Sequence, residues 1–177
     1  MYRPLSHSLT HTHTHTTFLL SHCDQYQGSI CGRYIRSDID VYIDGKAVDG
    51  NYLKIIARVQ SLLSDIQTLH SSKSSNALSS DLLDKCKTLA ESVACHTVFP
   101  YCDPDKSEHE PTKRPICQNT CDAFGVGGVC ESFINNQTSP DLYSRLMSNC
   151  DLRDNPAGES PACISVSLES TESKPFT

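Results

Sequence analysis

Ten cysteines are the residues of this chain that can do the most chemistry, and their number is even. So many thiols are a redox liability in a reducing compartment, whereas secreted domains of similar size use them as disulfides. The cysteines therefore predict a cross-linked domain in an oxidising environment, that is, an extracellular or cell-surface location. They are Cys23, Cys31, Cys86, Cys95, Cys102, Cys117, Cys121, Cys130, Cys150 and Cys163.

Zinc binding and thiol catalysis are the two other uses of clustered cysteines. Zinc sites usually contain C-x2-C pairs, but the close spacings here are C-x3-C and C-x6-C. Cys95 and His96 are adjacent, yet neighbouring side chains need not face each other, and a bridged cysteine is no nucleophile. The chain has no serine-elbow, phosphate-loop or paired-carboxylate motif. We therefore expect no catalysis, no metal and no other cofactor in this chain.

Composition narrows the class of partner. Hydrophobic residues make up 37% of the 177 residues and tryptophan is absent, so we expect a thin core that depends on its cross-links. The formal net charge of −6 argues against nucleic acid and anionic membrane surfaces, and it suits a basic protein ligand. No apolar run of about 18 residues is present, so we expect no membrane span. A signal peptide is not evident, since the apolar cluster at residues 18–20 is too short.

The chain divides into three parts. Residues 1–22 contain a His/Thr repeat without apolar periodicity, and we expect a disordered low-complexity tail. Residues 23–163 hold all the cysteines and form one domain. Residues 164–177 are rich in Ser, Thr and Glu, which predicts a flexible linker or tail.

Within the domain, periodicity predicts a mainly α, disulfide-rich fold with four short helices and small β segments. Short β segments are expected at Ile30–Ile35 and Ile39–Ile43, followed by a turn at residues 44–45. The first helix is expected over residues 51–69, before a polar loop at residues 71–76. Its apolar stripe is formed by Tyr52, Ile56, Val59, Leu63 and Ile66, widened by Leu53 and Leu62.

Three further helices follow. The second is expected to start near Ser80 as its N-cap and to stop before Pro100. Its inward face should carry Leu82, Leu83, Cys86, Leu89, Ala90 and Val93. A charged surface loop at residues 103–114 leads to a third helix with Pro115 in its first turn and Cys117 and Cys121 on one face. A fourth, opened by residues 139–141, carries Leu142, Leu146 and Met147.

One short motif predicts a covalent modification. Asn136-Gln137-Thr138 is an N-glycosylation sequon in a polar stretch just before the fourth helix. The alternative is an unmodified asparagine, because such short motifs are frequent by chance.

The cysteine spacing also resembles a known family. C-x7-C from Cys23, C-x8-C-x6-C from Cys86 and C-x3-C from Cys117 are similar to the Frizzled cysteine-rich domain. The segments CDQYQGSICGRYI, DVYIDG, CHTVFPYCD and PICQNTCDAFGVGGVC resemble most closely the version found in ROR and MuSK receptor tyrosine kinases. The sequence alone leaves the cysteine pairing open. The resemblance implies Cys23–Cys102, Cys31–Cys95, Cys86–Cys130, Cys117–Cys163 and Cys121–Cys150.

The resemblance implies binding of a Wnt-type, lipid-modified secreted protein. Frizzled domains hold the acyl chain of that ligand in an apolar groove between helices, but residues 77–81, before Cys86, are mixed and polar here. ROR-type domains share this feature and act as co-receptor or protein-contact modules. Leu78, Phe99 and Tyr101 are weak ligand-contact candidates. The alternative for the two aromatic residues is core packing beside the bridges.

This chain is therefore expected to be a ligand-binding fragment of a ROR-like receptor of the plasma membrane. Such a parent would continue into a kringle, a membrane span and a tyrosine kinase. Two alternatives are a secreted Frizzled-related decoy and an accessory domain of a secreted protease. The identity of the ligand and the oligomeric state are not specified by the sequence.

Overall fold

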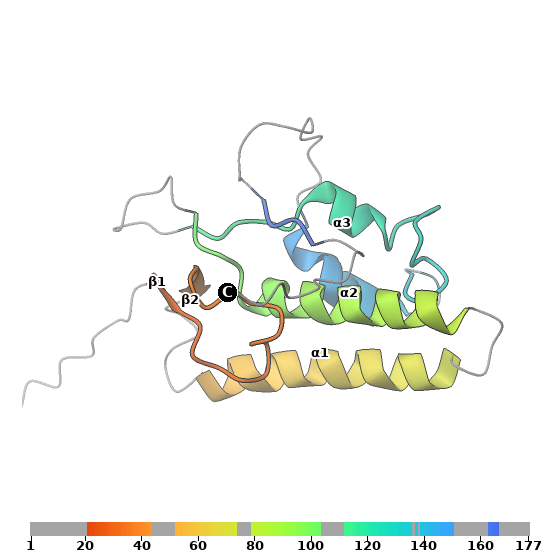
Figure 1. Cartoon of the computed structure of the whole chain (residues 1–177), viewed down its shortest axis with the longest axis horizontal. Coiled ribbons are helices and arrows are strands. Elements are labelled where there is room, and N and C mark those ends of the chain that lie inside the picture. The colour runs from red at the N-terminus through yellow and green to blue at the C-terminus, as the bar shows by residue number, and fades with distance from the viewer. Residues whose placement is uncertain are drawn as a thin grey trace, which may run out of the picture.

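A pair of long antiparallel helices forms the centre of the molecule in the computed structural model (Figure 1). The structure describes residues 21–43, 52–73, 79–103, 112–135, 137, 139–150 and 163–166. Helix α1 is Tyr52–Lys73 and helix α2 is Ser80–Val98. Two smaller helices, α3 (Gln118–Asp122) and α4 (Pro140–Leu146), complete the set of four described α-helices. The mainly α, disulfide-rich class is confirmed, although α1 and α2, with 22 and 19 residues, are not short.

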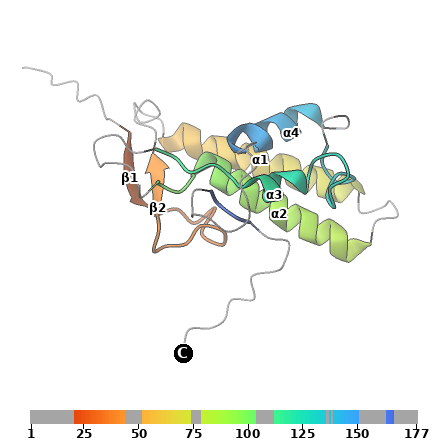
Figure 2. The same cartoon turned by 90° about the horizontal axis from the view of Figure 1, so that it is seen from above.

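A small sheet lies at one end of the helix pair (Figure 2). Strand β1 (His22–Gln25) pairs antiparallel with β2 (Asp40–Ile43), and Cys23 stands opposite Tyr42. Val41 also forms an antiparallel bridge with Tyr101, just beyond α2. The predicted β segment at residues 39–43 is thus confirmed for 40–43, while the turn predicted at residues 44–45 lies outside the described residues.

The β segment predicted at Ile30–Ile35 is wrong, because these residues form turns. The amides of Tyr34 and Ile35 both donate to the carbonyl of Cys31, each at 2.9 Å. Cys31 and Ile35 are both buried. A spacing of four brings two side chains to the same face of a helical turn, and not of a strand.

Helix α1 follows its predicted apolar stripe but ends later than expected. Leu62, expected at the margin of the stripe, is fully buried at its centre together with Val59 and Ile66. The helix continues through Ser71 and Lys73, so the predicted loop beginning at residue 71 is wrong over residues 71–73. The hydroxyl of Ser71 donates to the carbonyl of Gln67, one turn earlier in the helix, at 2.9 Å. The side chains of Tyr52 and Leu53 lie outside the described part of the chain.

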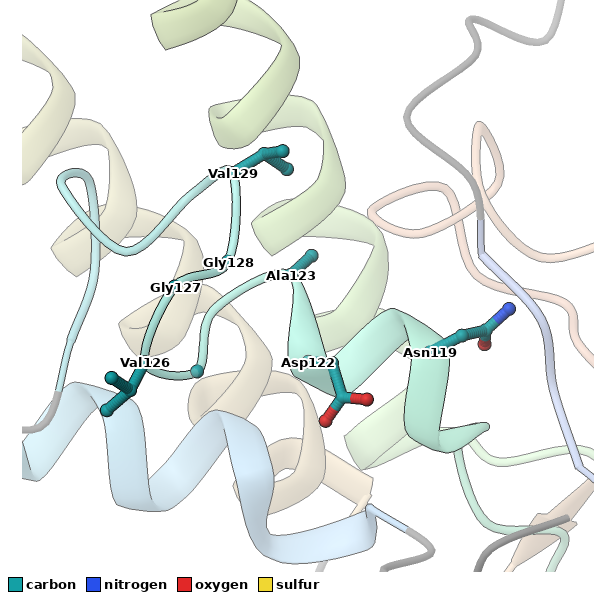
Figure 3. Close-up of a pocket in the computed structure, with 8 residues that line it drawn as sticks. Asn119, Asp122, Ala123, Val126, Gly127, Gly128 and Val129 are labelled. Carbon is teal, nitrogen blue, oxygen red and sulfur yellow. The ribbon is translucent and has the colours of Figure 1, made fainter.

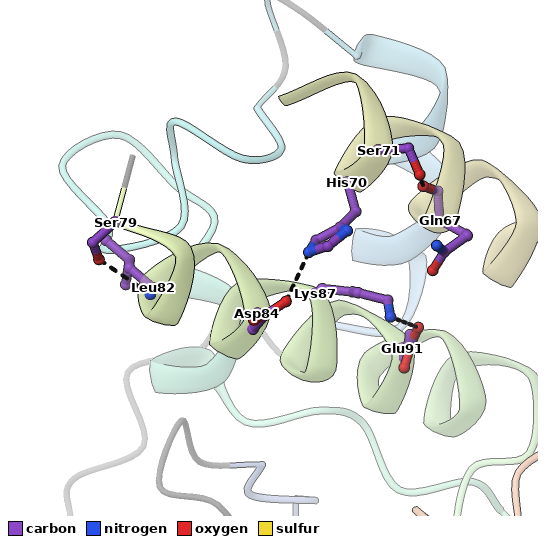
Figure 4. A network of polar contacts seen from close by, with 8 residues as sticks. All are labelled: Gln67, His70, Ser71, Ser79, Leu82, Asp84, Lys87 and Glu91. Carbon is purple, nitrogen blue, oxygen red and sulfur yellow. Dashed lines mark hydrogen bonds and ion pairs between the residues drawn. The ribbon is translucent and has the colours of Figure 1, made fainter. Parts of the chain in front are cut away.

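Helix α2 is the best-predicted element. Its inward residues are buried as expected, apart from the partly buried Leu82, and it ends at Val98, before Pro100. The N-cap is Ser79 and not Ser80, because the Ser79 hydroxyl accepts a hydrogen bond from the Leu82 amide at 3.3 Å (Figure 4).

The third helix starts later than predicted, and Pro115 is not part of it. The Ile116 amide donates to the Asn149 carbonyl at 2.7 Å, and Ile116 forms parallel bridges with Cys150 and Ile164. These pairings keep the backbone before Cys117 extended, so α3 starts only at Gln118. Helix α4 begins at Pro140 as predicted, buries Leu142 and Leu146, and passes into the short 3-10 helix η2 (Met147–Asn149). Met147 is only partly buried against the core.

Two hydrophobic clusters fill the molecule. The larger lies among α1, α2, α4 and residues 116–134, and the smaller joins the sheet end to α1 and residues 95–101. Ile164 is 5% exposed and its amide donates to the Pro115 carbonyl at 2.8 Å. The prediction of a flexible tail from residue 164 is therefore wrong for residues 164–166. The predicted N-terminal tail also extends one residue too far, because His22 belongs to β1. Residues 1–20 and 167–177 lie outside the described residues.

Candidate functional site

All ten cysteines form disulfides. They join Cys23 to Cys102, Cys31 to Cys95, Cys86 to Cys130, Cys117 to Cys163, and Cys121 to Cys150. These pairs are the same five that the family resemblance implies. Two of them hold the sheet end to the end of α2, one joins α2 to the segment after α3, and two fix α3 to the C-terminal segments.

The Cys95-His96 pair is not a catalytic dyad. Cys95 is consumed by its bridge to Cys31, and His96 points into the core, where it is 3% exposed. Burial lowers the pKa of His96 to about 4, an effect that its interaction with the Tyr34 backbone partly offsets. Its Nδ1 atom has no hydrogen-bond partner within the described residues. No three His, Cys, Asp or Glu side chains gather as a metal site in that part of the chain.

The structure places the aromatic ligand-contact candidates in the core. Phe99 is 1% exposed and meets the Tyr26 ring edge-on at a centroid distance of 5.0 Å. Tyr101 is 8% exposed, and its hydroxyl accepts a hydrogen bond from the Arg36 amide at 3.2 Å. The core-packing interpretation therefore describes both residues, and they do not form a surface patch. The third candidate, Leu78, and the sequon residue Asn136 lie outside the described residues.

The interface between α1 and α2 is filled by side chains. Leu62 and Ile66 of α1 and Val93 of α2 are all 0% exposed within the same cluster. At its polar margin, His70 Nε2 lies 2.8 Å from Asp84 Oδ1, which joins the two helices (Figure 4). At these three positions the space between α1 and α2 is therefore closed by side chains.

Glu91 links α2 to the turn at residues 31–35. The Tyr34 hydroxyl donates to Glu91, and Lys87 lies 3.6 Å from the same carboxylate. Burial, followed by the hydrogen bond to Glu91, raises the pKa of Tyr34. The contacts of Tyr34 and Lys87 with the Glu91 carboxylate therefore tie the turn at residues 31–35 to α2.

The surface feature that stands out is a segment after α3, which we call the Gly-Val loop (Gly125–Val129). It contains both of the large hydrophobic residues that are exposed in the described structure, Val126 at 98% and Val129 at 52%. The loop and the end of α3 enclose an open hollow of about 560 Å³ (Figure 3). Its lining residues are Asn119, Asp122, Ala123, Gly125, Val126, Gly127, Gly128 and Val129.

The glycines explain the shape of the Gly-Val loop. Gly127 has φ +79°, in the region that favours glycine, and its amide donates to the Glu131 carboxylate at 2.8 Å. A Cβ atom at Gly128 would overlap the carbonyl oxygens of Asp122 and Ala123. Next to the loop, Cys130 is bridged to Cys86 of α2. The loop is thus held against the helices at several points, although its valines face solvent.

The hollow beside the Gly-Val loop was not predicted from the sequence. The available signal was the alternation of valine with glycine, because a large apolar residue between glycines in a turn has few neighbours to cover it. Asp122 is the only charged residue of the lining, and it belongs to the last turn of α3. The hollow therefore combines apolar side chains, one carboxylate and exposed backbone, which suits a protein segment better than a long hydrocarbon chain.

No protein-family model matches the chain. Within the described residues, none of the helices is long and apolar enough to cross a membrane. The five disulfides indicate that the domain folds in an oxidising, extracellular environment.

Proposed function

We propose that this chain is an extracellular ligand-binding module, the Wnt-binding ectodomain fragment of a ROR-like receptor tyrosine kinase. The observation that carries the proposal is the cysteine pairing. Ten cysteines can pair in roughly 945 ways, and the five bridges in the structure are those of the Frizzled-type scheme. The two long packed helices and the small terminal sheet supply a rigid scaffold for a binding surface.

The mode of binding in this proposal is protein contact, and not insertion of an acyl chain. The filled interface between α1 and α2 supports this choice, since Leu62 and Ile66 are fully buried there. The open hollow beside the Gly-Val loop is lined partly by Asn119 and Asp122, which a hydrocarbon chain would desolvate without replacing their hydrogen bonds. The module then acts as a co-receptor that recognises the polypeptide of its ligand.

Surface plasmon resonance with the immobilised, oxidised 177-residue chain tests the proposal. The analytes are a panel of Wnt proteins, each with its acyl group intact and after enzymatic deacylation. We expect saturable binding of at least one Wnt, with similar affinity for the two forms. The reduced and alkylated chain is the control and should not bind. If no Wnt of the panel binds saturably, the receptor proposal is wrong; if binding vanishes on deacylation, the protein-contact mode is wrong.

A further inference from the structure

Val126 and the carboxylate of Asp122 project from the same side of the hollow (Figure 3). We propose that the Gly-Val loop and the end of α3 dock a protein segment that carries an apolar side chain next to a lysine or arginine. This inference rests on the proposed function and deepens it, because it names the chemistry of the ligand segment that the module recognises.

The apolar part of the proposal comes from Val126 and Val129. They are the large hydrophobic residues left exposed by a described fold that buries its phenylalanines completely, including Phe124 just before the loop. Removing a valine side chain from water contributes about 1.5–3 kcal/mol. A partner that covers Val126 with its own apolar side chain would therefore gain about tenfold or more in affinity from this contact alone.

The cationic part comes from the carboxylates around the loop. Asp122 lines the hollow, and Glu131 holds the base of the loop by accepting from the Gly127 amide. No lysine or arginine is among the lining residues. Lys73 is the basic residue that contacts the adjoining turn, and its ammonium donates to the Ser132 carbonyl outside the hollow. A lysine or arginine of the partner would meet complementary charge here, which favours both encounter and correct orientation.

The Gly-Val loop is already organised for binding. Three bonds fix its backbone: the Gly127 amide donates to Glu131, the Gly128 amide donates to the Gly125 carbonyl, and the adjoining Cys130 is bridged to Cys86. Less conformational entropy is lost on binding when a loop is held in place before the partner arrives.

Other occupants fit the hollow less well. A long acyl chain would lie against Asn119 and Asp122 and leave them without hydrogen-bond partners. A second copy of this chain in a two-fold contact would bring Asp122 towards its own copy, so like charges would oppose the dimer. A basic and apolar protein segment satisfies both features of the surface.

NMR titration of the ¹⁵N-labelled, oxidised full chain provides the test. The probe is a head-to-tail cyclic peptide containing Lys-Leu-Leu-Lys, and the matched probe has glutamates in place of the lysines. We expect the lysine peptide to shift the amide signals of Asn119, Asp122 and residues 125–129. Val126→Ser should weaken this binding about tenfold, and Asp122→Asn should weaken it and reduce its dependence on salt. Asp24→Asn on the exposed strand β1 is the control and should bind like the wild type.

Three results would overturn the docking surface. They are equal binding of the glutamate peptide, saturable binding of laurate at the same residues, and shifts of these signals on dilution of the chain alone. The same variants in the plasmon resonance experiment separate the two proposals. If a Wnt binds wild type, Val126→Ser and Asp122→Asn equally, the docking surface is wrong and the receptor function stands. If no Wnt binds but the lysine peptide does with the expected variant pattern, the surface is supported and the receptor function is wrong.

Discussion

The imidazole ring of His96 meets the ring of Tyr101 edge-on, with ring centroids 4.9 Å apart and planes inclined by 71°. The two residues belong to different parts of the fold. His96 lies in the last turn of α2, and Tyr101 follows Pro100 and forms a bridge with β2. Tyr101 belongs to the smaller hydrophobic cluster, which also contains the bridged residues Cys31 and Cys95.

Acid should destabilise the domain through His96. Its pKa is lowered to about 4 in the folded state, against an ordinary value of 6.5, so the unfolded chain binds more protons between these two values. The contribution of neutral His96 to the free energy of unfolding is therefore complete above pH 6.5. It is lost as the pH falls towards 4, by a total of about 3 kcal/mol. Urea unfolding of the oxidised chain at pH 7, 5.5 and 4.5 measures this loss.

The variant His96→Gln separates the loss of stability in acid that is due to His96 from the loss that is due to protonation of carboxylates. It should be less stable at pH 7 but should lose less stability between pH 7 and 4.5 than the wild type. His22→Gln is the matched control, because His22 lies on the exposed strand β1. An equal acid loss in His96→Gln and the wild type would contradict the prediction.

Peptide mapping without reduction should recover the five cysteine pairs. The pair Cys86–Cys130 should appear as one peptide that joins α2 to the residue after the Gly-Val loop, and Cys121–Cys150 as one that joins α3 to the residue after η2. Mass spectrometry before and after reduction identifies each pair. A peptide in which Cys23 is joined to Cys31 would contradict the arrangement.

Removal of the Cys86–Cys130 bridge should lower stability strongly. Both residues are 0% exposed in the larger cluster, and their sequence separation is 44. The chain-entropy relation gives a loss of about 4 kcal/mol for the double variant Cys86→Ala/Cys130→Ala, measured as the fall in the free energy of unfolding in urea. Removing the Cys23–Cys102 bridge, which holds the exposed strand β1, is the comparison and should leave the helix amide signals unchanged. A loss below about 1 kcal/mol for the first variant would be inconsistent with this prediction.

Gly128→Ala should destabilise the Gly-Val loop. The added methyl group would overlap the carbonyls of Asp122 and Ala123, so the backbone must move away from α3. The Cys130 amide donates to the same Ala123 carbonyl at 2.7 Å, and this bond should weaken too. We expect a loss of about 1–3 kcal/mol, typical of a strained or displaced backbone. At Gly32, a Cβ would meet only ordinary contacts at 3.5 Å, so Gly32→Ala should stay within about 0.5 kcal/mol of the wild type.

Thr97→Val should loosen the contact between α2 and α4. The Thr97 hydroxyl donates to the carbonyl of Leu146 at 3.0 Å in a buried position. Valine has the same shape but leaves that carbonyl without the donor, so we expect a loss of about 1–3 kcal/mol in thermal or urea unfolding. Thr68→Val, which removes an exposed bond to Ser64 within α1, should change stability little. Equal effects of the two substitutions would contradict a structural role for the buried bond.

Elements whose conformation is set by their local sequence, and not by contacts with distant residues, could be predicted. Helix α2 has a continuous apolar face and a following Pro100, and both are local properties. The turn at Cys31 could not be distinguished from a strand, because its geometry depends on packing of Cys31 and Ile35 against distant residues. The late start of α3 follows from the pairing of Ile116 with Cys150 and Ile164, contacts that no local pattern records.

The candidate site likewise contains features that could be predicted from the sequence and features that could not. The cysteine pairs followed from the family resemblance and from no property of the individual residues. Phe99 and Tyr101 were open to two interpretations, because aromatic residues serve both cores and interfaces. Only the structure shows that they are buried while Val126 is exposed.

The position of Ile116 between Cys150 and Ile164 has a consequence for biosynthesis. The segment around Ile116 cannot complete its backbone pairing until Cys150 and Ile164 have been translated, and these are among the last described residues. Helices α1 and α2 can pair while synthesis continues, since domains fold as the chain emerges. The Cys117 thiol, however, stays without its native partner until Cys163 enters the oxidising compartment. A message truncated before that codon would yield a chain with an unpaired thiol beside α3, a product suited to recognition by the quality control of the secretory pathway.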